Sequence, residues 1–342
     1  MSLTVPGEWA PHAALWLGFP SHGELWEDNL EPAQREVAAL ARALAGPGGE
    51  RVRLLVCGDA AAGAARALLQ GAPGGDSGIE IVHGEFGDIW LRDTGPLFYI
   101  EREQVKAAGF RFNGWGGKYV LAGDDTVAEQ IAAASGASLI AHDFVLEGGA
   151  LDHDGSGSVL TTRQCLLNPN RNPGLGQAEV EATLAASLGV RRVLWLGDGL
   201  LNDHTDGHVD NLARFVAPGV AACPIAFGRN DPNAHVYDET ARRLSEMTDA
   251  RGAPLQVMRI ASPGFIEDQD GRPIPASHMN FVIANGAVVC PIYEEQAGAF
   301  ALEALRSLFP ERQVIGLPSR AILTGGGSFH CITQHEPVFE PH

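Results

Sequence analysis

A short polar break that leads into an apolar strand recurs along this chain at intervals of roughly 50 to 70 residues, and four of its five copies contain glycine. The five breaks occupy residues 87–90, 147–150, 206–209, 277–280 and 326–329. Units of this size stack most naturally around an axis, and their polar breaks then meet at its centre. The repeat therefore predicts a five-unit α/β fold, with a plain α/β sandwich as the alternative.

Helical and extended patterns alternate from one end of the chain to the other, which is typical of an α/β protein. Apolar residues at helical spacing predict helices over residues 32–44, 60–69, 126–134, 178–188, 237–247 and 296–308. Apolar, β-branched runs predict strands over residues 52–57, 79–82, 97–100, 105–112, 158–162, 193–196, 212–216, 255–260, 280–284, 287–290 and 314–317. Asn285 and Gly286 predict a hairpin between two of these strands, with positive φ at both residues.

Length and charge limit the class of protein. The chain has 342 residues, of which 45% are hydrophobic, so it can bury a large core. We expect one domain over residues 1–342, with a surface loop in the Gly- and Pro-rich residues 71–78. Lys and Arg number 24 against 42 Asp and Glu, which gives a formal charge of −18. This charge disfavours nucleic acid and anionic membranes as partners and suits a cationic small molecule.

The chain shows no pattern for secretion or membrane insertion. Its N-terminus has no basic region before an apolar stretch, and no apolar run reaches the ~18 residues that a membrane span needs. We therefore expect a soluble, cytoplasmic protein. The oligomeric state stays open, and a homodimer is one assembly that the sequence allows.

Four of the five cysteines are expected to be structural. Cys57, Cys223 and Cys290 lie inside apolar, β-branched runs, and Cys165 precedes two leucines, so all four should be buried as small hydrophobic residues. The sequence contains no CxxC pair, which argues against structural zinc and dithiol redox chemistry.

Cys331 has a different setting. It follows three consecutive glycines at residues 325–327 and comes directly after His330. A thiol on a backbone cleared by glycine, with a distant His and several unpaired acids, is what covalent catalysis on a cationic carbon requires. The sequence therefore predicts a cysteine enzyme.

A dense polar cluster lies in the middle of the chain. Its ionisable residues are Asp203, His204, Asp206, His208 and Asp210. Because unpaired buried charge is costly, such a cluster does not suit a core strand. On an extended segment His208 and Asp210 would project to one face, which places a base beside a carboxylate. The alternative is a polar loop capped by Asp and Asn.

Two other segments supply acids. Asp93 follows an apolar run and could hold a cation, with Trp90 as a flat wall for an aliphatic stem; by themselves these residues also fit a turn with a core Trp. Glu147 ends an apolar run, where burial would raise its pKa unless a His or a cation pairs with it. A general base needs an orienting partner, and Glu147 could serve His208 in this way.

Together these segments resemble the family of agmatine deiminases and bacterial-type peptidylarginine deiminases, over nearly the whole chain. The matching segments are residues 8–12, 90–96, 112–118, 147–149, 160–162, 205–211 and 325–334. The resemblance implies a five-bladed α/β propeller, the pentein fold, with the active site on its pseudo-fivefold axis. It also implies hydrolysis of a guanidinium to a urea with release of ammonia, and no metal or organic cofactor.

The resemblance also implies a role for each matching residue. Cys331 is the nucleophile, His208 the general acid and base, and Glu147 the acid that orients His208. Asp93 and Asp210 clamp the guanidinium nitrogens. The remaining predicted substrate contacts are Asn280, Trp90 and Trp115.

The chemistry of a guanidinium explains this set of groups. Resonance spreads its charge and makes its carbon a poor electrophile, so two carboxylates must fix the plane while a thiolate attacks perpendicular to it. His208 then protonates the departing ammonia and activates the water that resolves the thiouronium. Carboxylates around a thiol raise its pKa, so the thiolate of Cys331 should form only when the substrate cation offsets them.

Agmatine is the predicted substrate, because an acidic chain favours a dication over a zwitterion. Arginine and C-terminal peptidylarginine are the alternatives within the same reaction, and an amidinotransferase would pass the amidino group to an amine. In a different class, a metal-dependent hydrolase could bind Zn or Mn through His204, Asp206, His208 and Asp210. That reading leaves Cys331 without a role. A non-catalytic binding protein is the remaining alternative.

Overall fold

The computed structural model describes residues 3–71 and 78–339, whose strands form one four-stranded sheet and four three-stranded sheets. Residues 72–77 of the predicted surface loop lie outside the described residues. In every sheet a first strand pairs antiparallel with a second, a helix follows, and a third strand returns parallel to the second. The chain therefore contains the five similar units that the polar breaks predict.

The five units use corresponding elements. The first strands are β16 (Thr333–Pro337), β4 (Leu97–Glu101), β7 (Asp152–His153), β10 (Arg214–Ala217) and β13 (Val282–Ile283). The second strands are β1 (His12–Gly18), β5 (Gln104–Arg111), β8 (Ser158–Thr162), β11 (Val220–Ile225) and β14 (Ala287–Ile292). The helices are α2 (Leu30–Ala45), α6 (Val127–Ser135), α8 (Gln177–Leu188), α9 (Ala234–Glu246) and α10 (Glu295–Leu308). The third strands are β2 (Val52–Val56), β6 (Ser138–Val145), β9 (Arg192–Leu196), β12 (Gln256–Ala261) and β15 (Gln313–Pro318).

The first unit carries an extra helix and strand, α3 (Gly58–Leu69) and β3 (Ile79–His83). All six predicted helices are confirmed, because each has a continuous apolar face; in α2 the buried residues include Val37, Leu40 and Leu44. The predicted strands are also confirmed, although residues 280–284 narrow to β13. The strands β1, β6, β7, β11 and β16 were not among the predicted ones, and β16 is a polar segment buried along its whole length.

The hairpin at Asn285 and Gly286 is confirmed, since Ile283 pairs with Val288. The predicted positive φ at both residues is wrong, because neither has a left-handed backbone. Gly286 is needed for space instead: an added Cβ would lie 2.6 Å from the carbonyl oxygen of Pro47. Close packing against the loop at Pro47, rather than the type of turn, therefore requires glycine at position 286.

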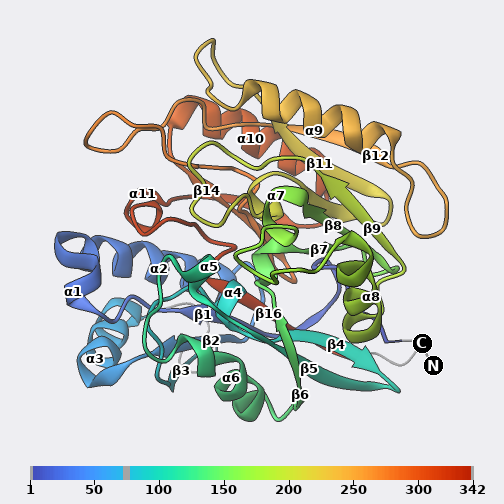
Figure 1. The fold of residues 1–342 in the computed structure, drawn as a ribbon. Coiled ribbons are helices and arrows are strands. Elements are labelled where there is room, and N and C mark those ends of the chain that lie inside the picture. The colour runs from blue at the N-terminus through green and yellow to red at the C-terminus, as the bar shows by residue number, and fades with distance from the viewer. Residues whose placement is uncertain (1–2, 72–77, 340–342) are drawn as a thin grey trace.

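Neighbouring units contact one another in sequence, and the last unit contacts the first. The strand β16 touches β4, β10 touches β7, α10 packs on β12, and α2 packs on β14 and β15. Residues of β4 and β8 share one apolar cluster, which joins the remaining pair of units. Figure 1 shows α6, α8 and α9 at the edges of the view and the short helix α4 (Leu91–Thr94) near its middle.

The polar breaks lie together. The helix α4 contacts the 3₁₀ turn η4 (Gly148–Ala150), and η4 contacts the turn η5 (Val209–Asn211). The pairing of β16 with β1 unites the two ends of the chain in one sheet, so the segment around Cys331 comes beside α4. Within the described residues, no helix has both the length and the apolar character that crossing a membrane demands.

Candidate active site

A cavity of about 320 Å³ leads to Cys331. It is lined by Leu25, Trp26, Glu27, Asn29, Asp88, Trp90, Asp93, Trp115, Tyr119, Leu121, His204, Thr205, residues 324–327 and Cys331. Trp26 and Trp90 stack with their ring centroids 6.3 Å apart, and both indole N–H groups donate to the buried carboxylate of Asp88. The predicted wall at Trp90 is therefore present, and it is fixed by an acid that the prediction did not include.

The three glycines before Cys331 make room for this wall. An added Cβ at Gly325 would lie 2.8 Å from both Trp26 and Trp90, and one at Gly327 would lie 2.6 Å from Trp90. Gly326 has a φ of +108°, which side-chain-bearing residues rarely adopt. Cys331 is 6% exposed and reaches the cavity across this cleared segment.

Asp93 is held by neutral donors. Its Oδ1 atom accepts from the backbone N–H of Gly149 at 2.9 Å, and its Oδ2 atom accepts from the indole N–H of Trp115 at 2.8 Å. Trp115 reaches it from a left-handed backbone with φ of +52°, a costly conformation for a bulky residue. Burial raises the pKa of Asp93, the charge of His208 opposes that rise, and Asp210 adds to it.

Asp210 and Asn280 contact Cys331 from the other side. The side-chain N–H of Asn280 donates to the Cys331 Sγ atom at 3.1 Å and lies 3.4 Å from Asp210 Oδ2. Its Oδ1 atom accepts from the backbone N–H groups of His330 and Cys331. Burial opposes ionisation of Asp210, but His330 holds the pKa of that carboxyl below its usual value.

His208 lies among three of the predicted residues and is 1% exposed. Its Nδ1 atom is 3.6 Å from Asp93 Oδ1, and its Nε2 atom is 3.9 Å from Glu147 Oε2. An added Cβ at Gly149 would lie 2.6 Å from His208 Nδ1, so the glycine permits this approach. The predicted extended segment is wrong: His208 precedes the 3₁₀ turn η5, because the buried polar cluster forms turn hydrogen bonds instead of a sheet ladder.

Arg171 is a site residue that the sequence analysis missed. Its Nε atom donates to Glu147 Oε1 at 2.6 Å, and its Nη1 atom donates to Asp206 at 2.5 Å. Burial opposes ionisation of Glu147, but His208 and Arg171 lower its pKa. The signal that could have revealed Arg171 is a lone cation in the Asn- and Pro-rich residues 168–173.

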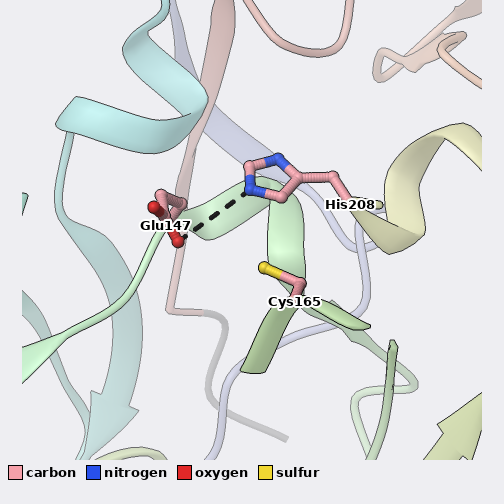
Figure 2. A group of neighbouring side chains, drawn as sticks. All are labelled: Glu147, Cys165 and His208. Carbon is pink, nitrogen blue, oxygen red and sulfur yellow. Dashed lines mark ion pairs between the residues drawn. The ribbon is translucent and has the colours of Figure 1, made fainter. Parts of the chain in front are cut away.

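Glu147, Cys165 and His208 form a buried group whose donor atoms all lie within 4.8 Å of one another (Figure 2). Cys165 is buried as predicted, but it faces the site residues as well as the core. Thiolate, carboxylate and imidazole can hold a zinc ion. Two features disfavour this use: Arg171 already occupies Glu147, and Asp93, Cys165 and Glu147 raise the pKa of His208 well above its usual value despite the opposing effect of burial. The group fits proton transfer better than metal binding.

The predicted metal ligands do not come together. His204 is exposed and packs against Tyr119, and Asp206 pairs with Lys118 at 2.6 Å, so neither joins His208 and Asp210 among the described residues. One cysteine prediction is also wrong: Cys57 is only half-buried, because it follows the end of β2.

The surroundings of Cys331 raise the pKa of its thiol, as the sequence analysis expected. Burial raises the pKa of the thiol well above its usual value, and the facing carboxylates of Asp210 and Asp93 raise it further. The site therefore holds a thiol beside carboxylates, and the described residues that line its cavity include no Lys or Arg. A bound cation between the carboxylates would lower the pKa of that thiol.

The chain is similar to agmatine deiminases over almost its full length. The agmatine deiminase of Pseudomonas aeruginosa (strain LESB58) is 38% identical over 361 residues, which cover 98% of this chain and 95% of that protein. The solved agmatine deiminase of Enterococcus faecalis has a TM-score of 0.91 and 32% identity, with 99% of this chain and 97% of that chain covered. An amidinotransferase from Microseira wollei, 11% identical at a TM-score of 0.54, shares the fold alone.

The mixed α/β fold and its structural neighbours belong to the pentein superfamily. Within it, residues 4–337 match the family described as Porphyromonas-type peptidyl-arginine deiminase. The chain belongs to that family.

Proposed function

We propose that this protein is an agmatine deiminase, which converts agmatine and water to N-carbamoylputrescine and ammonia. The observation that carries the proposal is a cavity lined by Asp93 and Cys331, with Asp210 Oδ2 3.6 Å from the Cys331 Sγ atom and His208 Nδ1 3.6 Å from Asp93 Oδ1. The full-length similarity to agmatine deiminases supports the same reaction.

The residues suit a two-step covalent mechanism. Asp93 and Asp210 bind the planar guanidinium, and the bound cation favours loss of the Cys331 proton. The thiolate attacks the guanidinium carbon, and a C–N bond breaks as His208 donates a proton to the departing ammonia. This leaves a thiouronium on Cys331. Water then attacks the same carbon and gives one proton to His208. The C–S bond breaks as the second proton of that water is lost to solvent, which releases the neutral urea product and restores the thiolate.

The far end of the cavity favours a second positive charge. Glu27 and Asp88 line it, and none of its described lining residues is Lys or Arg. A substrate that ends in a carboxylate, such as arginine or a C-terminal peptidylarginine, would want such a cation there. Agmatine ends in an ammonium group, which suits an acidic rim.

A panel of guanidino compounds tests the proposal. Agmatine, arginine, a peptide with C-terminal arginine and guanidinobutyrate would be assayed for ureido product and for free ammonia. We expect agmatine to have the highest kcat/KM. Preferred turnover of arginine or the peptide would refute the substrate, and transfer to an amine without ammonia would indicate an amidinotransferase.

Glu27 offers a sharper test of the substrate end. It lines the cavity, is exposed, and has a φ of +47°. We expect Glu27→Gln to raise KM for agmatine by about twofold to fivefold, with little change for guanidinobutyrate, because a single exposed ion pair contributes roughly 0–1 kcal/mol. Glu24→Gln, an exposed neighbour outside the lining, is the control.

The larger architecture follows from the same arrangement. We propose that the five units stand around one axis as the blades of a single catalytic propeller over residues 1–342, because consecutive units contact one another around a closed order. A homodimer and a cytoplasmic location stay predictions.

A further inference from the structure

Glu8 is an N-terminal carboxylate that reaches the back of the active site. It matches the family through residues 8–12, yet the proposed mechanism gives it no role. Its Oε1 atom lies 2.8 Å from His330 Nε2 and 2.9 Å from Arg92, and its Oε2 atom pairs with Arg214. Burial opposes ionisation of Glu8, but Arg214, His330, His335 and Arg92 hold its pKa well below the usual value. Glu8 therefore carries a negative charge.

His330 connects this charge to Asp210. Its ring is 1% exposed, and its Nδ1 atom lies 2.8 Å from Asp210 Oδ2. With a carboxylate at each nitrogen, the ring can donate to both only as an imidazolium cation. Glu8, His330 and Asp210 thus form a continuous chain of charge-assisted hydrogen bonds.

The hydrogen bonds that link Glu8, His330 and Asp210 use only the Oδ2 atom of Asp210, and they leave its Oδ1 atom without a partner among the described residues. Asp210 Oδ2 faces His330 and also lies 3.6 Å from Cys331 Sγ. Asp210 Oδ1 is buried and has no hydrogen-bond partner within the described part of the chain. A buried unpaired carboxylate oxygen costs free energy unless a ligand satisfies it, and a guanidinium N–H group would do so.

We propose that Glu8 and His330 are positioning residues that keep Asp210 ionised and fixed, with its Oδ1 atom free for the guanidinium. The inference rests on the proposed function of Asp210 as a substrate clamp. It assigns the N-terminal segment a part in substrate binding. The other charged or titratable groups that face Glu8, His330 or Asp210 are Arg92, Arg214, His335, Asp152, His153, Asp93, His208 and Cys331.

The test compares Glu8→Gln with a matched control. Glu50 is also a buried carboxylate beside an imidazole, 2.9 Å from His12 Nδ1, but it belongs to a different pair. Glu8→Gln removes the carboxylate charge that faces His330 Nε2, so His330 should hold Asp210 less firmly and the pKa of Asp210 should rise. We expect KM for agmatine to rise about tenfold with a smaller change in kcat, and the acidic limb of kcat/KM to move up by roughly one pH unit. Glu50→Gln should leave that limb unchanged, and Glu8→Asp, which keeps the charge, should move it less than Glu8→Gln.

A second measurement does not depend on turnover. Chloroacetamidine is a cation and chloroacetamide is neutral, so the ratio of their alkylation rates at Cys331 reports the negative charge around the thiol. Mass spectrometry of the Cys331 peptide separates this reaction from the other cysteines. We expect the ratio near pH 5.5 to fall about fivefold to tenfold in Glu8→Gln and not in Glu50→Gln. An unchanged ratio in folded Glu8→Gln overturns the inference, whereas failure of the wild type to deiminate agmatine overturns the proposed function alone.

Discussion

The two sides of His208 each hold a thiol and a carboxylate, but they differ in positive charge. On the far side, Arg171 pairs with Glu147 next to Cys165, and all three side chains are buried. On the cavity side, Cys331 faces Asp93 and Asp210 without an arginine between them. The far side is electrostatically complete, whereas the cavity side needs a cation.

This difference explains why burial alone does not decide the role of a cysteine. Burial raises the pKa of both Cys165 and Cys331. Only Cys331 reaches the cavity, where a bound guanidinium can reverse the effect. Catalysis therefore depends on which thiol the substrate charge can approach.

Replacing each of the two cysteines in turn should give the largest difference in activity between the two sides of His208. We expect Cys331→Ala to lower kcat/KM by about 10⁴-fold or more, because the nucleophile is lost. Cys165→Ala removes only a neighbour of His208 and should cost less than about tenfold. Steady-state assays with agmatine measure both. Comparable losses in the two variants, with both folded, would contradict the assignment of the nucleophile.

Removing the far-side cation should be the next largest effect. Arg171→Gln leaves Glu147 buried without its partner, and breaking such a pair costs about 3–5 kcal/mol of unfolding free energy. We expect kcat to fall by about tenfold to 100-fold as well, because Glu147 and His208 lose their fixed charge state. Urea unfolding and steady-state kinetics measure the two effects.

The control for Arg171 is Arg242→Gln. Arg242 also pairs with glutamates, Glu239 and Glu246, but its side chain is 52% exposed. Solvent screens such pairs, so this change should leave the midpoint of urea unfolding almost unchanged. Equal losses in the two variants would show that the far side has no special electrostatic role.

Much of the site followed from the sequence because its residues lie in dense, unusual segments. Cys331 and His208 have neighbours that fit neither a core strand nor an ordinary loop. Asp93 and Glu147 were suggested by acids next to apolar runs, and the resemblance supplied Asn280. Arg171 and Glu8 were not assigned because their partners lie far away in sequence. Their pairings depend on how separate units and the two chain ends meet, which local patterns do not encode.

The same limit applies to the fold. Long amphipathic helices such as α2 are readable from spacing, and so was the repeat of polar breaks. The strands β7 and β16 are short or polar, and tertiary hydrogen bonding stabilises them rather than intrinsic propensity. The contact of His208 with Cys165 likewise depends on where the short helix α7 (Arg163–Leu166) meets η5.

A thiol titration measures directly whether a cation on the cavity side lowers the pKa of Cys331. Without a ligand, the Cys331 thiol should ionise above the value of about 8.5 for a free cysteine, since its pKa is raised. Millimolar guanidinium chloride should lower the midpoint by roughly one unit or more, and urea, which is neutral, should not. Thiolate absorbance measures the shift, with Cys331→Ala as the blank. A midpoint insensitive to guanidinium would remove the case for substrate-induced activation.

The smallest effect concerns stability and pH, and it compares two buried histidines with opposite shifts. The pKa of His208 is raised well above its usual value, while burial lowers that of His278 to about 4. His208 therefore stabilises the fold below its unfolded-state pKa of about 6.5, and this contribution is lost as pH rises through its folded-state pKa. His278 has the opposite sign: its contribution is present above about 6.5 and is lost as pH falls towards 4.

The variants His208→Gln and His278→Gln should consequently show opposite trends. The loss in Tm for His208→Gln should be about 2–4 °C larger at pH 6 than at pH 9, and that for His278→Gln should be larger at pH 9 than at pH 5. Thermal unfolding monitored by circular dichroism over this pH range gives both slopes. Parallel slopes would mean that Asp93 and Glu147 do not hold His208 as a cation, and proton donation to the departing ammonia would then need another group.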